Sequence, residues 1–463
     1  MKIGANYGLI TLLCLAFGAW VFFFTDLYII SKFGLVLSVL ITMLFLDGLG
    51  KNIPIKELIG QLMLLQMLVC PVIVYNYFDN DMLYPMDVNE EVYLNFVFPA
   101  ILFYLAGLFV PINKNKLNLS QIINNIEIDK TVNAKIGIVL ILIGYSVSLV
   151  NRFVPATLGF LVFLLINFKF IGAIYLLFSN NRFKYLWIIT VWGFYIYETV
   201  GGGIFINLFV WGLLLAIFFA FRFRFTMITK ILLFVGGIFV VFFINSFKAE
   251  YRTILAPAAI PIYSERAESK QKVFLDMAAE KATTTEGYYE TSDLNNFISR
   301  LNQGWIFAKV LDHVPEKEPF TGGATFQNDI YTSIVPRFLD PTKTVRGGKE
   351  GAKKFERFTG RRLLEGTTMT IGILGDAYVN FGFTGAFIFM FAFGLVLNLV
   401  LYWIYDLSRV YPTLILWVPF IFFYTMRAGN EFGVVLNFMT KSLVVVFGVF
   451  YLYKKQFGIG KAV

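Results

Sequence analysis

Runs of about 20 apolar residues recur along most of the chain, and an α-helix of that length crosses the hydrocarbon core of a membrane. Short segments between the runs hold many of the charged residues. Only 15% of the 463 residues are charged, whereas soluble proteins contain about 25%. Such a chain cannot cover its surface with polar side chains. We therefore expect an all-α, polytopic membrane protein.

The apolar runs predict about twelve transmembrane helices and one large, partly helical external loop. The expected helices cover approximately residues 7–24, 27–46, 55–77, 92–110, 135–150, 155–178, 184–199, 203–221, 227–247, 383–405, 412–428 and 432–453. Asn167 and Lys169 interrupt the sixth, which predicts a kink or break there. The chain then consists of an N-terminal transmembrane bundle (1–247), the external loop (248–381) and C-terminal transmembrane helices (382–463).

The distribution of charge predicts the orientation. Basic residues gather in the segments that follow the even-numbered runs, whereas segment 79–91 is acidic. Cytoplasmic loops are enriched in Lys and Arg, so both termini are expected in the cytoplasm and residues 248–381 outside. The same loops account for the net charge of +9. No nucleic-acid partner is therefore expected.

Few residues are suited to metal or nucleotide chemistry. The two cysteines, Cys14 and Cys70, lie in apolar runs, and His313 is the single histidine. The chain has no glycine-rich nucleotide-binding motif and no paired cysteines. We expect no metal site, no nucleotide and no other cofactor.

Two helices are expected in the external loop. Residues 263–282 have a helix-like composition, and 295–314 carry apolar residues every three to four positions. Asp293 is a candidate cap for the second helix, and the Gly-rich segment 321–323 is expected to end it.

The strongest candidate site residues are charges at the expected outer boundary of the membrane. Lys248 and Arg252 are four residues apart, on one face of a helix, with Glu250 between them. Such a pair can bind a phosphate, or it can simply anchor the helix end at the interface. Arg300 lies on a predicted external helix, where an arginine is more often only solvated.

Three further candidates follow along the chain. Segment 337–362 holds nine basic residues, beginning with Arg337, and three acidic ones. It fits an anionic partner, and it equally fits a mobile, solvated loop. Arg427 and Glu431 are boundary charges that would pair if the helix continues through both. His313 alone is more often structural than catalytic.

Several short motifs in sequence order resemble a known family. They are Arg300 with Trp305, Pro319–Gly323, Ile334–Phe338, Thr370–Gly372, Tyr378–Gly385 and Arg427–Gly429. This order is similar to that of bacterial oligosaccharide repeat-unit polymerases, including O-antigen polymerases. The similarity covers mainly residues 245–440, and no single motif is specific. Their order and the topology carry the resemblance.

The resemblance implies a glycosyltransferase of the bacterial cytoplasmic (inner) membrane, which polymerises undecaprenyl-diphosphate-linked repeat units into O-antigen, capsular or exopolysaccharide. The implied partners are that lipid-linked oligosaccharide and membrane lipid, while a chain-length regulator remains open. Residues expected to bind substrate or its diphosphates are Lys248, Arg252, Arg300, Arg337, Tyr378, Arg427 and Glu431. Candidate catalytic residues, including the general base, are Glu250, Asp376 and His313, together with Arg252 and Arg300.

Three alternatives stay open. The related O-antigen ligases carry a histidine shortly before the Gly-x-x-Gly helix, where this chain has Thr367–Thr370 and where His313 is far upstream. A transporter of lipid-linked sugars would need two related halves and polar residues along its helices, which the sequence lacks. A structural scaffold would not explain the arginines gathered on one side.

Overall fold

The computed structural model describes residues 7–78, 84–112, 119–155, 158–203, 205–223, 225–255, 270–283, 291–335, 339–340, 342–343, 348–364 and 367–457. Every regular element in these ranges is helical, and none of them contains a strand. The expected all-α fold is confirmed. The chain forms two compact units, of which unit 1 comprises Leu46–Pro54 and Leu119–Leu301, and unit 2 comprises Gly4–Phe45, Ile55–Asn118 and Asn302–Val463.

Ten helices in the described ranges are long and apolar enough to cross a membrane, which is compatible with a multi-pass membrane protein. Two of the expected spans are not among the ten. The span expected at 184–199 forms a helix, Lys184–Gly202, but Tyr, Trp and charged residues make it less apolar. The span expected at 412–428 is a shorter apolar segment, Pro412–Met426.

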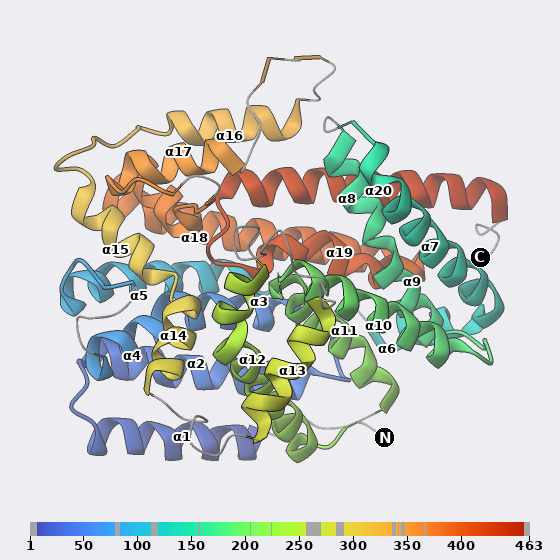
Figure 1. Cartoon of the computed structure of the whole chain (residues 1–463), viewed down its shortest axis with the longest axis horizontal. Helices are drawn as coiled ribbons and strands as arrows, with labels where there is room; N and C mark the ends of the chain where they lie inside the picture. The colour runs from blue at the N-terminus through green and yellow to red at the C-terminus, as the bar shows by residue number, and fades with distance from the viewer. Residues whose placement is uncertain are drawn as a thin grey trace, which may run out of the picture. The chain divides into compact units, whose positions relative to one another are not determined.

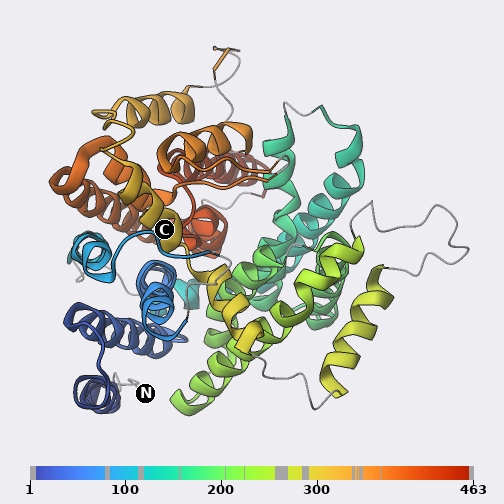
Figure 2. The same ribbon diagram turned by 60° about the vertical axis from the view of Figure 1, so that its left-hand side comes forward.

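Unit 1 contains most of the middle of the chain (Figure 1). Its helices are α6 (Leu119–Ile128), α7 (Lys130–Val150), a 3-10 turn (Asn151–Phe153), α8 (Gly159–Ile166), α9 (Phe168–Leu177), α10 (Lys184–Gly202), α11 (Ile206–Phe223), α12 (Met227–Leu255), α13 (Lys270–Thr283) and α14 (Thr291–Leu301). α13 packs against α10 and α12, as Figure 2 shows for the yellow-green helix beside the green ones.

The expected interruption of the sixth apolar run lies at Asn167, between α8 and α9. The Asn167 side chain accepts a hydrogen bond from the Trp211 indole at 3.0 Å. The neighbouring Lys169 is 1% exposed and forms an ion pair with Glu198 at 2.8 Å. A lysine can therefore lie in this apolar run because it has a carboxylate partner.

Unit 2 contains the remaining helices. They are α1 (Tyr7–Phe24), α2 (Ile29–Gly48), α3 (Ile55–Leu64), the π-helical turn η1 (Leu65–Val69), α4 (Cys70–Tyr77), α5 (Glu90–Leu108), α15 (Gly304–His313), α16 (Ala324–Ile334), α17 (Gly348–Thr359), α18 (Gly372–Leu407), η6 (Pro412–Trp417), α19 (Val418–Phe422), η7 (Phe423–Met426) and α20 (Phe432–Phe457). α5 and α18 make the most extensive helix pair of the unit. Figure 1 shows α16 and α17 close to α18.

Glycines let the α5–α18 pair pack backbone against backbone. A Cβ atom on Gly394 would lie 2.2 Å from the Tyr104 carbonyl oxygen, and one on Gly107 would lie 2.1 Å from the Phe391 carbonyl oxygen. Small residues bring transmembrane helices together in this way, so that van der Waals contact replaces the hydrophobic effect. In unit 1, Gly137 and Gly172 do the same for α7 and α9.

Three interruptions break the described helices of unit 2. At two of them other segments bind the freed polar groups, and next to Gly382 the Thr321 amide donates to the Val379 carbonyl at 2.8 Å. At the π turn, the Gln66 backbone carbonyl accepts a hydrogen bond from the Gln303 backbone amide at 3.0 Å. The Gln66 side-chain oxygen accepts a second one from the Ala428 backbone amide at 3.1 Å. α18 is broken at Gly382, which has the left-handed φ of 65°. The third interruption is the segment Pro412–Met426, where prolines prevent a continuous α-helix.

The expected helix at 295–314 is wrong in its extent. The structure has two helices there, α14 and α15, with a break at Asn302 and Gln303. Asp293 does not cap a helix, because it lies inside α14, where Lys281 donates to it at 2.9 Å. The Gly-rich segment ends no helix either, because Gly323 is the N-cap of α16.

Replacing Gly394 by alanine tests the close packing of α5 against α18. The new methyl group would collide with the Tyr104 backbone, and overpacking of this kind costs about 1–3 kcal/mol. We expect Gly394→Ala to lower the thermal unfolding temperature in detergent. Gly212→Ala, where nothing lies within 4 Å of the new Cβ, is the control and should unfold like the wild type. Equal unfolding temperatures for all three proteins would contradict the described packing.

Candidate functional site

Unit 1 holds a group of basic side chains that we call the cationic cluster: Lys248, Arg252 and Arg300. Lys248 and Arg252 are one turn apart on α12, and α14, which carries Arg300, packs against α12. The Arg252 Nε donates to the Gly203 carbonyl at 3.0 Å. The Lys248 ammonium lies 5.6 Å from the centroid of the Phe205 ring. The structure thus brings together three residues that the sequence analysis proposed for diphosphate binding.

The cationic cluster has an excess of positive charge. The charged groups that act on Lys248 are the two arginines, and burial together with Arg300 lowers the pKa of Arg252. The Arg300 Nε is buried and has no hydrogen-bond partner in the described part of the chain. Uncompensated donors of this kind favour an anion that accepts several charge-assisted hydrogen bonds, such as a phosphate.

Glu250 does not belong to the cationic cluster. It is exposed. It lies two positions from both Lys248 and Arg252 along α12, and this spacing puts it on the opposite face of the helix. The structure therefore gives Glu250 no position from which it could act as a base beside the cluster.

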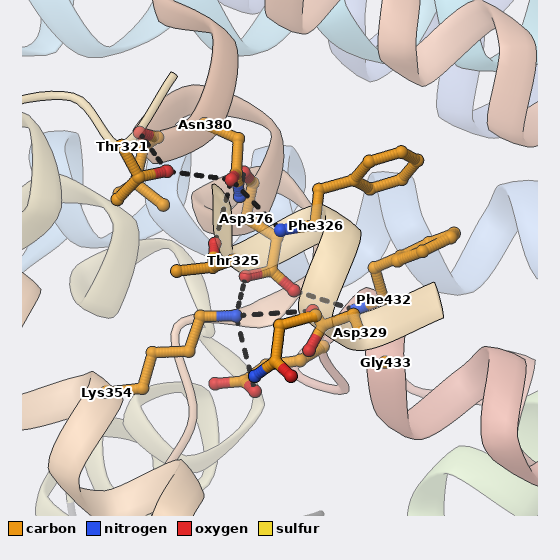
Figure 3. Close-up of polar contacts among 12 residues, drawn as sticks. Thr321, Thr325, Phe326, Asp329, Lys354, Asp376, Asn380, Phe432 and Gly433 are labelled. Carbon is orange, nitrogen blue, oxygen red and sulfur yellow. Dashed lines mark hydrogen bonds and ion pairs between the residues drawn. The ribbon is translucent and has the colours of Figure 1, made fainter. Parts of the chain in front are cut away.

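Unit 2 holds a second group that we call the Lys354 cluster: Lys354, Asp329, Asp376 and Glu431 (Figure 3). Lys354 comes from α17, Asp329 from α16 and Asp376 from the first turns of α18, while Glu431 directly precedes α20. The Lys354 Nζ forms a close ion pair with Asp376 and lies 3.7 Å from both Asp329 Oδ2 and Glu431 Oε2. One ammonium group therefore faces three carboxylates.

All three carboxylates are buried, at 1% exposure for Asp329, 2% for Asp376 and 4% for Glu431. Burial of an unpaired charge is costly, so such groups are paired or shift their protonation. Burial raises the pKa of Glu431 to about 8, and Asp376 and Asp329 act in the same direction while Lys354 opposes them. The three carboxylates raise the pKa of Lys354 against the effect of burial, so Lys354 is positively charged at neutral pH.

Local structure fixes the carboxylates in place. Asp376 Oδ2 accepts the backbone amide of Phe432 at 2.8 Å and thereby caps the start of α20. The Asp329 side chain packs directly against Gly433, where a Cβ would lie 2.7 Å from the Asp329 Cγ. A larger residue than glycine at this position would therefore displace Asp329. The cluster thus ties the beginnings of α18 and α20 to α16 and α17.

Asn380, shortly before the helix break at Gly382, supports the same region (Figure 3). The Asn380 side-chain oxygen accepts hydrogen bonds from the Thr321 hydroxyl at 2.7 Å, the Thr325 hydroxyl at 2.8 Å and the Phe326 amide at 3.2 Å. One amide side chain therefore holds the start of α16, and Asp329 is one turn further along this helix.

The other residues proposed from the sequence are divided between the Lys354 cluster and separate positions. Asp376 and Glu431 both lie in the Lys354 cluster. Tyr378 is part of the core, where its hydroxyl donates to the Val314 carbonyl at 3.2 Å. The His313 ring packs against Gly360, at which a Cβ would lie 2.7 Å from the ring. Arg337 lies outside the described residues.

The expected pairing of Arg427 with Glu431 required a continuous helix, and this condition is not met. η7 ends at Met426, and Arg427 has the extended dihedrals φ −130° and ψ 113°. Glu431 faces Lys354.

Sequence reasoning did not single out Lys354 or Asp329. The signal for Lys354 was present, because Gly351, Lys354, Phe355 and Phe358 follow the spacing of one helix face, and the other three are buried. Asp329 gave no comparable signal. The described residues contain no group of three or more side chains suited to holding a metal ion.

The model of a family described as a domain of unknown function, DUF8712, matches residues 104–459. The chain belongs to this family. No curated protein and no solved structure matches it. The matched range of DUF8712 includes every residue of the cationic cluster and of the Lys354 cluster, so both groups lie within the family domain.

Inorganic pyrophosphate is expected to stabilise the wild-type protein if the cationic cluster binds a diphosphate. A ligand at about 100 times its Kd adds about 2.7 kcal/mol to the free energy of unfolding. Arg300→Met should abolish this gain and leave the ligand-free protein equally or more stable, because a partly buried guanidinium with an unpaired Nε gives way to an apolar side chain. Thermal unfolding with and without pyrophosphate measures both effects. Arg222→Met, an exposed arginine of α11, is the control, and an equal gain in all three proteins would argue against the site.

Gly433→Ala is expected to push Asp329 away from Lys354 and to lower the stability by about 1–3 kcal/mol. In an Asp329→Ala background the two closest contacts disappear and only the Cβ of residue 329, at 3.1 Å, remains, so the same glycine substitution should cost clearly less. Gly448→Ala, on the same helix with nothing within 4 Å of its new Cβ, is the control. A cost for Gly433→Ala that is independent of residue 329 would show that another contact is responsible.

Proposed function

We propose that this protein is a membrane glycosyltransferase that polymerises polyprenyl-diphosphate-linked oligosaccharide repeat units into O-antigen, capsular or exopolysaccharide at the outer face of the bacterial cytoplasmic membrane. The cationic cluster is the observation that carries the proposal. Lys248, Arg252 and Arg300 converge at the end of a span-length helix, and no described carboxylate forms an ion pair with them. The order of motifs that resembles repeat-unit polymerases includes Arg300.

The chemistry requires such a cluster. In the proposed reaction the growing chain leaves its polyprenyl diphosphate and is joined to a hydroxyl of the incoming repeat unit. Negative charge then develops on the departing diphosphate, and preorganised donors that stabilise developing charge are commonly the largest single contribution to catalysis. The sugar–diphosphate bond supplies the driving force, so the reaction needs no nucleotide.

The proposed arrangement in the membrane follows the charge distribution. It has about twelve crossings, with both termini in the cytoplasm and residues 248–381 outside. Lipid headgroups and the lipid-linked repeat unit are the proposed partners. The cationic cluster would then lie near headgroup depth, because Lys248 ends the apolar stretch Met227–Lys248.

Purified protein tests the proposal directly. Wild type is incubated with a synthetic polyprenyl diphosphate repeat unit, without nucleotide or metal, and the products are separated on a gel. A ladder of polymers is expected from the wild type and from Arg222→Ala. Arg300→Ala should reduce the rate by about a hundredfold or more, the typical cost of removing one donor to a developing charge.

Two outcomes would contradict the polymerase proposal. Transfer to an added lipid acceptor without a ladder would identify a ligase. Movement of the lipid-linked sugar across liposome membranes, with no transfer to any acceptor, would identify a transporter.

A further inference from the structure

The cationic cluster of unit 1 holds three like charges together, and two of them come from a different helix than the third. Lys248 and Arg252 are fixed on α12, whereas Arg300 comes from α14. Each charge acts unfavourably on its neighbours, because like charges repel. This repulsion pushes α14 away from α12 as long as no anion is bound. The contacts that hold α14 in place therefore decide how well the cluster is preorganised for an anion.

One face of α14 makes two such contacts. Asp293, Phe297 and Arg300 are separated by four and three residues, which places them on one face of this helix. The Phe297 ring packs edge-to-face against the Phe242 ring of α12, with 5.4 Å between the ring centroids. In the first turn of α14, Asp293 Oδ2 accepts a hydrogen bond from Lys281 Nζ at 2.9 Å. The helix is therefore attached to α12 at its middle and to α13 at its start.

α13 is in turn attached to the part of α12 that carries the cluster. The Phe274 ring of α13 lies 5.2 Å from the Phe247 ring and 5.4 Å from the Tyr251 ring, measured between centroids. Each of these two α12 residues directly precedes a basic residue of the cluster. Phe274 and Lys281 are seven residues apart and so lie on one side of α13. The helix thus connects the end of α12 with the start of α14.

The ion pair of Lys281 with Asp293 is well suited to hold α14. Only 24% of the lysine side chain and 12% of the aspartate side chain are exposed, and shielding from water strengthens the attraction between the two charges. Seven residues of an α-helix span about 10 Å, so Asp293 is too far along α14 to pair with Arg300. The carboxylate therefore fixes the helix without neutralising the guanidinium group.

We propose that Lys281 is a positioning residue, whose ion pair with Asp293 keeps Arg300 in the cationic cluster. The inference rests on the proposed function, since the anion concerned is the diphosphate that the cluster is proposed to bind. The pair acts through Arg300 and does not need to touch the anion. Donors that are already in place bind an anion more tightly, because binding then requires less ordering of the protein.

The experiment measures the Kd for inorganic pyrophosphate by titration calorimetry, with the full-length protein well below its unfolding temperature. Lys281→Met and Asp293→Asn should each raise the Kd by about threefold to tenfold, the range for residues that act on a site without touching its ligand. Lys281→Arg keeps the positive charge and should bind nearly as tightly as the wild type. Lys130→Met is the control, because it breaks another ion pair of unit 1, that with Glu127, and it should leave the Kd unchanged.

A double variant separates positioning from a purely structural role. Lys281→Met combined with Asp293→Asn leaves no unpaired charge, so it also serves if a single variant does not fold. Its Kd should be no higher than that of the weaker single variant, because the two residues act as one unit. A purely structural ion pair would change the unfolding temperature of these variants and leave the Kd of the folded protein at the wild-type value. That result, or additive effects of the two substitutions on the Kd, would overturn the proposal.

The ladder assay, run on the same proteins, keeps this inference apart from the proposed function. Pyrophosphate binding that depends on Lys281, without a ladder from the wild type, would keep the positioning role and refute the polymerase. A ladder together with pyrophosphate binding that is independent of Lys281 would keep the polymerase and refute the positioning role. No binding of pyrophosphate to the wild type would overturn the positioning role, and the ladder alone would then decide on the polymerase.

Discussion

Where the apolar helices of unit 2 are interrupted, the freed backbone amides and carbonyls must form hydrogen bonds with other parts of the protein. The fold of unit 2 depends on these bonds. Away from water, an unpaired peptide group costs several kcal/mol, and irregular backbone is tolerated only where protein or a cavity surrounds it. Gln66 uses both its backbone carbonyl and its side chain at one break, and before the break at Gly382 the Val379 carbonyl accepts the Thr321 amide at 2.8 Å. These hydrogen bonds tie the irregular segments to neighbouring elements of unit 2.

The two charged clusters differ in the sign of their excess charge. The cationic cluster gathers donors without a described counter-ion, which favours a ligand that brings negative charge. The Lys354 cluster holds more carboxylates than ammonium groups, which favours the retention of a proton on Glu431.

Sequence reasoning predicted the parts of this structure that depend on local composition. The apolar runs predicted most of the span-length helices, and the spacing of Lys248 and Arg252 placed both on one helix face. The break at Asn167 was predicted by a polar residue within an apolar run. In each case the signal lies within about one helix length.

The remaining features depend on contacts between distant segments. Asp329 and Lys354 come together because α16 and α17 pack next to the starts of α18 and α20. No sequence pattern predicts this packing. The break between α14 and α15 at Asn302 follows a similar logic, because the Gln303 amide binds the carbonyl of Gln66, far away in the sequence. Helical periodicity continues across this break, so the pattern alone predicts one helix.

The π turn at Leu65–Val69 has a consequence for how sequences of this family can diverge. A π turn holds more residues per turn than an α-helix, and each residue of an α-helix rotates the following side chains by about 100°. The wide turn therefore absorbs one extra residue, and losing that residue would restore a regular α-helix while leaving Cys70–Tyr77 in nearly the same orientation relative to Ile55–Leu64. Homologues should therefore accept a single-residue gap at Leu65–Val69 more readily than elsewhere in this span.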